Sequence, residues 1–285
     1  MITVGNFKGG VAKTTTAVSL AQALTLRGRR VLVIDCDPQG TTTQLCGWAP
    51  DAEIQEEQTL LPLIEGEKED LTYAPQSTYW HRLDLIPALS VLFDAEFIIP
   101  SRVIKTSRFQ FWDILNKGIK PLTESYDVIV IDTPPALSYL TINALIASDG
   151  VLMPCPPDAF DFASSTQFWH LFSDIAEKLP GVLESKRFDS INIVLTKVKI
   201  GSISQVVRGW LQKAYGGHLL PIEIPESSVA KGTSAQLSTV YDLSKAEGSA
   251  EAYRRYKEPL DRLAEHFDLQ FMRIWNKKEG SNGNR

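Results

Sequence analysis

The stretch "NFKGGVAKTTT", residues 6–16, follows a short apolar segment and precedes a run rich in alanine and leucine. It places a glycine pair and two lysines, Lys8 and Lys13, directly before the threonines. In such a loop the backbone N–H groups point inward, and the N-terminus of the following helix adds partial positive charge. The stretch therefore predicts a phosphate-binding loop between a strand and a helix.

This loop departs from the common phosphate-binding pattern G-x-x-x-x-G-K-[ST] at two positions. Phe7 and Ala12 stand where that pattern has glycine. Lys13 can still reach the β- and γ-phosphates of a nucleotide, and the hydroxyl of Thr14 can bind Mg²⁺. The alternative interpretation is an ordinary glycine turn before an amphipathic helix, with the threonines as caps.

Short apolar runs without polar alternation predict strands that are buried on both faces, as in a parallel sheet. These runs are residues 29–37, 126–135, 150–157 and 191–198. Residues 14–28 show the clearest helical pattern, and Gly28 is its predicted end. The alternation predicts one α/β domain, a mostly parallel twisted sheet with helices on both faces. We expect residues 50–75 to be an acidic surface excursion and residues 276–285 to be a disordered tail.

Carboxylates stand at the ends of two predicted strands. Asp35 and Asp37 end one of them in "DCDPQG", and Asp132 ends another in "VIVIDTPP". Ligands of open parallel sheets bind at the carboxyl ends of the strands. An aspartate placed there by a rigid strand is a suitable oxygen ligand for Mg²⁺. A purely structural role, in which the aspartate caps the next turn, explains one of these residues better than all of them together.

The composition is that of an ordinary globular protein, with 285 residues, 22% charged residues and a net charge of −5. A chain with this charge is no polycation, so any contact with nucleic acid requires a local basic face. The three cysteines have no C-x-x-C spacing, which argues against a disulfide framework and fits a reducing compartment. We see no signal-peptide pattern and no apolar run of about 18 residues, so we expect a cytoplasmic location.

Several segments together resemble the deviant Walker-A ATPases, and among them the ParA-type partition ATPases. The most specific are "KGGVAKTTT", "DCDPQG" and "DVIVIDTPPALSYLTINAL". Residues 83–97, 156–169, 224–243 and 252–267 are similar to the longer ParA and RepA subgroup. The resemblance implies a P-loop NTPase fold over residues 1–275. That subgroup carries a helix-turn-helix domain before this strand, and this sequence opens on the strand itself, so operator binding is not carried over.

The resemblance also implies roles for individual residues. Lys8 would be the signature lysine, which reaches the nucleotide of the other subunit, so that two ATP molecules lie between two chains. A cation supplied from a second chain stabilises the charge of the transferred phosphoryl group; a solvated surface lysine is the alternative. The catalytic set would be Lys8, Lys13 and Asp37, with Asp37 positioning the attacking water. The metal set would be Thr14, Asp35 and Asp132. The nucleotide-binding set would be Lys8, Gly9, Gly10, Val11, Ala12, Lys13, Thr14, Thr15, Thr196, Lys197, Pro225 and Glu226.

The implied partners are a second copy of the chain, nonspecific DNA and a ParB-like protein that stimulates ATP hydrolysis. A nucleoid-associated location would follow. For DNA we favour a stretch without acidic residues, 190–222, which contains Lys197, Lys199, Arg208 and Lys213. Other candidate clusters are Arg102, Lys105 and Arg108, and Arg254, Arg255 and Lys257. An ordinary solvated face is the alternative for each of them.

Three other functions compete with this one. A MinD-like positioning ATPase would need a basic amphipathic helix for the membrane surface, and residues 269–278 are a faint candidate. An electron-transfer iron–sulfur ATPase would need a suitably placed cysteine pair, which this sequence lacks. An adaptor that has lost hydrolysis would not require the combination of Lys8, Lys13, Asp37 and Asp132. We therefore expect membrane association to be absent and ATP and Mg²⁺ to be bound.

Overall fold

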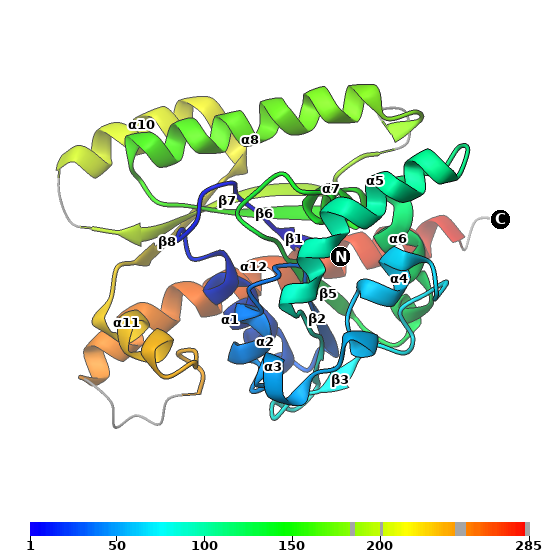
Figure 1. Cartoon of the computed structure of the whole chain (residues 1–285). Helices are drawn as coiled ribbons and strands as arrows, with labels where there is room; N and C mark the ends of the chain where they lie inside the picture. Colours follow the sequence, from blue (N-terminus) through cyan, green and yellow to red (C-terminus); the bar gives the residue numbers. More distant parts are fainter. Residues whose placement is uncertain (183–185, 200–201, 243–248, 283–285) are drawn as a thin grey trace.

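The computed structural model describes residues 1–182, 186–199, 202–242 and 249–282. Within these residues the strands are β1 Ile2–Val4, β2 Val31–Asp35, β3 Gln76–Ser77, β4 Leu83–Ile86, β5 Val128–Asp132, β6 Gly150–Cys155, β7 Ser190–Val198 and β8 Leu219–Pro225. They form one sheet in the order β3-β4-β2-β5-β1-β6-β7-β8 (Figure 1). Neighbouring strands are parallel except for β3 and β4. The predicted strands are therefore present, and they lie side by side at the centre of the sheet.

The helices connect the strands and cover both faces of the sheet (Figure 1). They are α1 Lys13–Leu26, α2 Thr41–Leu45, α3 Pro50–Glu53, α4 Leu61–Glu65, α5 Ala95–Lys105, α6 Ile114–Ile119, α7 Tyr139–Ala147, α8 Ala159–Lys178, α10 Ser202–Tyr215, α11 Ser228–Ala235 and α12 Ala250–Asn282. Gly28 follows α1 with a φ of 86°, a conformation that glycine adopts without steric cost. The predicted fold class, a mostly parallel sheet with helices on both faces, is confirmed.

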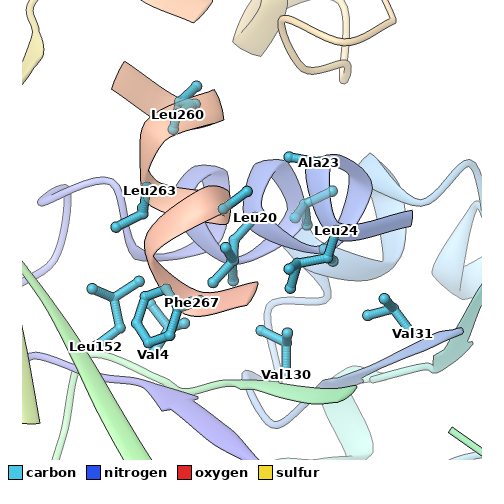
Figure 2. Packing of buried hydrophobic residues seen from close by; sticks show 14 of the residues in the cluster. Val4, Leu20, Ala23, Leu24, Val31, Val130, Leu152, Leu260, Leu263 and Phe267 are labelled. Carbon is cyan, nitrogen blue, oxygen red and sulfur yellow. The ribbon is translucent and has the colours of Figure 1, made fainter. Parts of the chain in front are cut away.

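One face of the sheet is covered by α1 and α12, which lie far apart in the sequence. Figure 2 shows Leu20 and Leu24 of α1 beside Leu263 and Phe267 of α12, above the strand residue Val130. All of these side chains are almost fully removed from solvent. Alternate residues of a strand point to opposite faces, so this cluster takes only every second residue of β5. The first and last thirds of the chain therefore share one core.

The opposite face is covered by two groups of helices. Ile34 of β2 and Ile131 of β5 belong to the cluster formed with α4–α7, whereas Met153 of β6 and Leu195 of β7 belong to the cluster formed with α8 and α10. Because the central strands are buried on both faces, their sequences are continuously apolar. The pattern that predicted the strands is thus explained by this double covering.

The segment 50–75 is not the surface excursion that its acidic composition predicts. Its charged residues are exposed, but its apolar residues enter the core below β2 and β5. The buried residues are Ile54, Leu60, Leu61, Leu63, Ile64, Leu71 and Ala74. The prediction was wrong because short helices and a 3-10 turn bury their apolar residues without a regular period over the whole segment.

The end of the chain also differs from the prediction. We expect a disordered tail from residue 276, but the structure continues α12 through Asn282. Extending an existing helix avoids the cost of nucleation, and lysine and glutamate are good helix formers. Residues 283–285 lie outside the described part, and the limits of the predicted domain, 1–275, stay a prediction.

The strand order brings the loop after β1 and the ends of β2 and β5 to the same end of the sheet, where the parallel strands terminate. The loop after β1 lies centrally, because β1 pairs with β5 on one side and β6 on the other. Asp35 and Asp132 are direct partners in the register of β2 and β5. The carboxyl ends of the parallel strands meet at this edge, so the candidate residues are brought together by the sheet itself.

Candidate active site

The loop between β1 and α1 has the backbone conformation of a cradle. Gly10 has a φ of 73° and Ala12 a φ of 71°, so both lie in the left-handed region. Glycine enters this region freely, whereas alanine is strained there. Between them the side chain of Val11 is buried, and the hydroxyl of Thr196 donates to its carbonyl at 2.9 Å. The loop is therefore held in place by a side chain at the end of β7.

Lys13 is the first residue of α1, and its ammonium turns back toward the loop. Its Nζ donates to the carbonyl of Lys8 at 3.0 Å. Burial lowers the pKa of Lys13, and the nearby carboxylates of Asp132 and Asp37 oppose that effect. A partly desolvated cation beside a loop at the start of a helix is an arrangement that attracts a polyanion.

Asp132 ends β5 at the floor of the site and is hydrogen-bonded by two threonines. The hydroxyls of Thr14 and Thr42 each donate to its Oδ2 at 2.7 Å. Burial raises the pKa of Asp132 to about 6, although these hydrogen bonds and the charge of Lys13 oppose the shift. Its other oxygen, Oδ1, is buried without a hydrogen-bond partner in the described part of the chain. An unsatisfied carboxylate oxygen beside a threonine hydroxyl is a donor set that fits Mg²⁺.

Asp35 has a different environment, although it stands beside Asp132 in the sheet. Its Oδ2 accepts from the backbone and the hydroxyl of Thr43 at 2.9 and 2.8 Å, and its Oδ1 accepts from the backbone of Asp37 at 3.1 Å. Burial and the charge of Asp132 raise the pKa of Asp35 to about 8. Both of its oxygens thus serve the turn that follows β2. Asp37, two residues later, is half-buried and reaches the cavity described next.

A cavity of about 510 Å³ extends from the loop toward the ends of β7 and β8. This volume suits a small organic ligand with a phosphate chain. Of the predicted nucleotide and catalytic residues it brings together Gly9, Gly10, Ala12, Lys13, Thr14, Thr15, Asp37, Thr196, Lys197, Pro225 and Glu226. Lys8, Val11, Asp35 and Asp132 are not part of its wall. Thr196 is fully buried and bonded to Val11, so it supports the wall of the cavity.

The sequence reasoning missed part of the opposite wall. Ser227, Ala230 and Lys231 near α11, and Tyr256 and Leu260 of α12, also line the cavity. Lys231 forms an ion pair with Glu226, at 3.2 Å between Nζ and Oε1. No spacing in the sequence identifies Tyr256 and Leu260, because α12 reaches the cavity through its packing on α1, β8 and α11.

Lys8 lies outside this cavity and points to another element. Its Nζ is 2.8 Å from Oδ1 of Asp161, in the first turn of α8. The side chain of Lys8 is 41% exposed. The two lysines of the loop therefore face different surroundings, Lys13 toward the loop and Lys8 toward α8 and solvent.

Two of the predicted DNA-contact residues form ion pairs with acidic neighbours. Arg208 of α10 forms an ion pair with Glu223 of β8 at 2.7 Å, and Lys199 pairs with Glu226 at 3.2 Å. The stretch 190–222 has no acidic residue, but the fold brings in acids from just beyond its end. Lys197 lines the cavity, and Lys213 is exposed in the last turn of α10.

One residue of each of the other two basic clusters also has a partner within the chain. Arg102 lies over the ring of Phe109 and donates to the carbonyl of Ile64 at 2.5 Å, so it caps the end of α4. Lys257 pairs with Asp261 one turn away on α12, at 2.7 Å. These two cations have structural partners within the chain, which the local sequence does not show.

The candidate membrane segment, residues 269–278, is part of α12. Phe271 is buried, and its ring stacks against that of Trp275 at 5.9 Å between centroids. The guanidinium of Arg29, which follows α1, lies over the ring of Trp275 at 5.1 Å from its centroid. In the described residues, moreover, we find no helix that combines the length and apolarity needed to cross a bilayer.

Comparison with known proteins identifies the family. A family model described as an AAA domain matches residues 1–185. The chain is 35% identical to SopA of Escherichia coli (strain K12) over 250 residues, which cover 85% of this chain and 63% of SopA. It is 30% identical to the chromosome partitioning protein ParA of Myxococcus xanthus over 218 residues, covering 75% of this chain and 72% of that protein. The chain thus spans less than two thirds of the length of SopA.

Solved structures agree with this result. Cobyrinic acid a,c-diamide synthase from Mycobacterium smegmatis, with bound ATP analog and magnesium, is 28% identical and has a TM-score of 0.72, covering 93% of this chain and 94% of that one. The ATP complex of a variant of McdA from Cyanothece has a TM-score of 0.75 at 22% identity, covering 94% and 95%, and shows the same fold. Together with the phosphate-binding loop and the strand-end aspartates, these matches show that the chain belongs to the ParA-type family of P-loop partition ATPases.

Proposed function

We propose that this chain binds ATP with Mg²⁺ in the cavity beside α1 and hydrolyses it slowly. The observation that carries the proposal is the buried Oδ1 of Asp132, which has no hydrogen-bond partner among the described residues. The other oxygen of Asp132 accepts from Thr14, which lines the cavity together with the phosphate-binding loop. The M. smegmatis relative, which has bound ATP analog and magnesium, supports the choice of ligand.

In this proposal each residue acts from its observed position. The backbone of Gly9 and Gly10 cradles the phosphates, and Lys13 exchanges its bond to the Lys8 carbonyl for phosphate oxygens. Thr14 and Asp132 would hold Mg²⁺, and the bound ion neutralises charge on the triphosphate. Asp37 accepts a hydrogen bond from a water molecule and orients it for attack. Asp35 keeps the turn that carries Asp37 in place.

The proposal includes a dimer that forms around the nucleotide. Lys8 is absent from the wall of its own cavity and half-exposed, so its ammonium is available to the triphosphate of a second copy. A cation supplied in this way stabilises the charge that develops during phosphoryl transfer. ATP thereby controls the association of the two chains.

Membership of the family supports a role in partition. We propose that the ATP-bound dimer binds DNA without sequence preference, and that a ParB-like protein stimulates hydrolysis and so releases the dimer. The location would be cytoplasmic, on the nucleoid. A MinD-like membrane function has less support, because Phe271 and Trp275 of the candidate segment pack on the core.

The decisive experiment is the oligomeric state as a function of nucleotide. Size-exclusion chromatography with ADP, ATP and a slowly hydrolysed ATP analogue should give a dimer only with the triphosphates. The same elution in all conditions would contradict the proposal. Asp37→Ala should retain ATP binding and the dimer, and should abolish turnover measured as phosphate release. Unchanged turnover in that variant would remove the proposed role of Asp37.

A further inference from the structure

The ammonium of Lys8 is anchored on a buried carboxylate. Its Nζ is 2.8 Å from Oδ1 of Asp161, and the two side chains are 41% and 8% exposed, respectively. Asp161 belongs to the first turn of α8, where the partial positive charge of the helix N-terminus stabilises an anion. A flexible lysine on a loop is thus tied to a rigid element.

This ion pair compensates a charge that has no other partner at the same atom. Within the described part of the chain, no hydrogen bond to Oδ1 of Asp161 accompanies the ion pair. Removing the ammonium of Lys8 would leave the buried carboxylate of Asp161 without its compensating charge, which is unfavourable. We therefore expect Lys8 and Asp161 to stay together when a second molecule approaches.

The geometry leaves the lysine free to bind a further acceptor. An ammonium group has three N–H donors, and its contact with Asp161 is an ion pair at 2.8 Å. Solvent exposure of the Lys8 side chain leaves donors for an anion outside its own chain. Lys13, by contrast, faces the carbonyl of Lys8 inside the loop.

On the basis of the proposed function, we propose that Asp161 is the positioning residue of Lys8: it holds the ammonium where the triphosphate of a second copy can reach it, and it remains paired with Lys8 in the ATP-bound dimer. Because Asp161 acts through Lys8, its replacement should change the affinity of one chain for the other. Nucleotide binding by a single chain should not depend on it.

The test compares Asp161→Asn with Lys8→Ala and with the double variant. The readouts are the affinity of the monomer for a fluorescent ATP analogue and the dimer dissociation constant in ATP and Mg²⁺, measured by sedimentation velocity. Asp161→Asn should leave the monomer affinity within about twofold and weaken the dimer about tenfold, the effect of losing one charge-assisted contact. On the Lys8→Ala background, Asp161→Asn should cause no further loss, since the two residues act as a unit.

The matched control is Asp158→Asn, the N-cap of the same helix. Its side chain accepts from the backbone of Phe160 at 2.9 Å, and asparagine caps helices equally well. This variant changes the charge by the same amount and should dimerise as the wild type does. Thermal unfolding checks that each variant is folded. If Asp161→Asn does not fold, Asp161→Glu replaces it, because the longer carboxylate displaces the ammonium and should weaken the dimer with unchanged monomer affinity.

Each other result overturns the inference. A dimer of wild-type affinity in Asp161→Asn shows that the pair does not position Lys8. A tighter dimer shows that Asp161 restrains Lys8 in the free monomer. Additive losses in the double variant show that Asp161 acts independently of Lys8. If the wild type itself stays monomeric in ATP, the proposed dimer is wrong and this inference with it, whereas a failure confined to the Asp161 variants leaves the proposed function intact.

Discussion

Asp35 and Asp132, at the ends of neighbouring strands, differ in their hydrogen bonds. Both are fully buried, and both have a raised pKa because burial disfavours the charged form. Asp132 keeps one oxygen unpartnered within the described residues, whereas both oxygens of Asp35 accept bonds from the turn after β2. We therefore propose Asp132, and not Asp35, as the Mg²⁺ ligand, whereas Asp35 accepts from the backbone of Asp37 and shapes the chain there.

Because the pKa of Asp35 is raised to about 8, we expect this residue to make the free energy of unfolding depend on pH. Between the unfolded pKa of Asp35 and about pH 8, the carboxyl is protonated in the folded state and ionised in the unfolded state. Its contribution to stability is complete below the unfolded pKa and is lost as the pH rises toward 8. Asp35→Asn does not titrate, so its free energy of unfolding relative to wild type should increase between pH 5 and 8, by on the order of 1 kcal/mol or more.

The measurement is urea denaturation of both proteins at the two pH values, without nucleotide. The amide also changes the hydrogen bond to the backbone of Asp37, so the quantity compared is the change in the stability difference between pH 5 and 8 and not its absolute value. A stability difference that does not change with pH would mean that Asp35 stays in one protonation state over this range.

Ala12 has a strained backbone conformation, which replacement by glycine should relieve. Its φ of 71° is unfavourable for a residue with a Cβ atom. Ala12→Gly should raise the free energy of unfolding by about 0.5–1 kcal/mol, because the relief exceeds the added entropy of the unfolded chain. The control is Ala163→Gly in the exposed side of α8, which should destabilise by about 1 kcal/mol. Destabilisation by Ala12→Gly would contradict the left-handed conformation.

Among the elements, α1 is the helix that connects the phosphate-binding loop to the rest of the molecule. It packs on the sheet and, along its flank, against α12, which covers the same face of the sheet (Figure 2). Even polar residues of α1, such as Ser19 and Gln22, are buried. The position of Lys13 and Thr14 at its start therefore depends on packing contributed by the far end of the chain.

Phe267 of α12 tests this dependence, since it is fully buried against α1 and the sheet. Phe267→Ala should lower the free energy of unfolding by about 3–5 kcal/mol, through lost burial and the cavity left behind. The control, Met272→Ala, alters an exposed side chain of the same helix and should change stability by less than about 0.5 kcal/mol. Urea denaturation followed by circular dichroism measures both. A small effect of Phe267→Ala would mean that α12 contributes little to this core.

Over the molecule as a whole, the surface charge pattern is set by contacts between elements. Arg208 on α10 and Glu223 on β8 are paired, so this arginine presents less positive charge than the sequence suggests. If α10 contacts DNA in the proposed dimer, Glu223 opposes that contact. The acid can be removed without touching any cation of the face.

Glu223→Gln should therefore strengthen the binding of nonspecific DNA in the presence of ATP, by about two- to fivefold, and steepen its salt dependence because one more cation is released to phosphate. Fluorescence anisotropy with a labelled duplex at several salt concentrations measures both effects. Glu69→Gln, which removes an exposed acid in the segment after α4, is the matched control and should have no effect. Equal affinities for the two variants would exclude this face of α10 from DNA binding.

Local features explain why much of the fold and part of the site could be predicted. The buried strand 128–132 is apolar up to Asp132, and strand 150–155 is apolar throughout. The phosphate-binding loop lies directly between a strand and the helix that begins with Lys13 and Thr14. These signals depend on neighbouring residues, because backbone conformation and burial of a short element are determined over a few positions. The strand-end aspartates follow from the same pattern, since parallel strands present their carboxyl ends at one edge.

Charges and side chains from distant segments meet only in the folded chain. The pairing of Lys8 with Asp161, the neutralisation of Arg208 by Glu223 and the arrival of Tyr256 at the cavity have no local signal. Electrostatic and packing interactions act through space, and the chain folds residues 8 and 161 together only because β1 and β6 are neighbours in the sheet. The family and the phosphate-binding loop can be recognised from the order of residues alone, whereas the partner of each functional charge depends on the fold, because Coulomb energies and burial depend on distances that only packing sets.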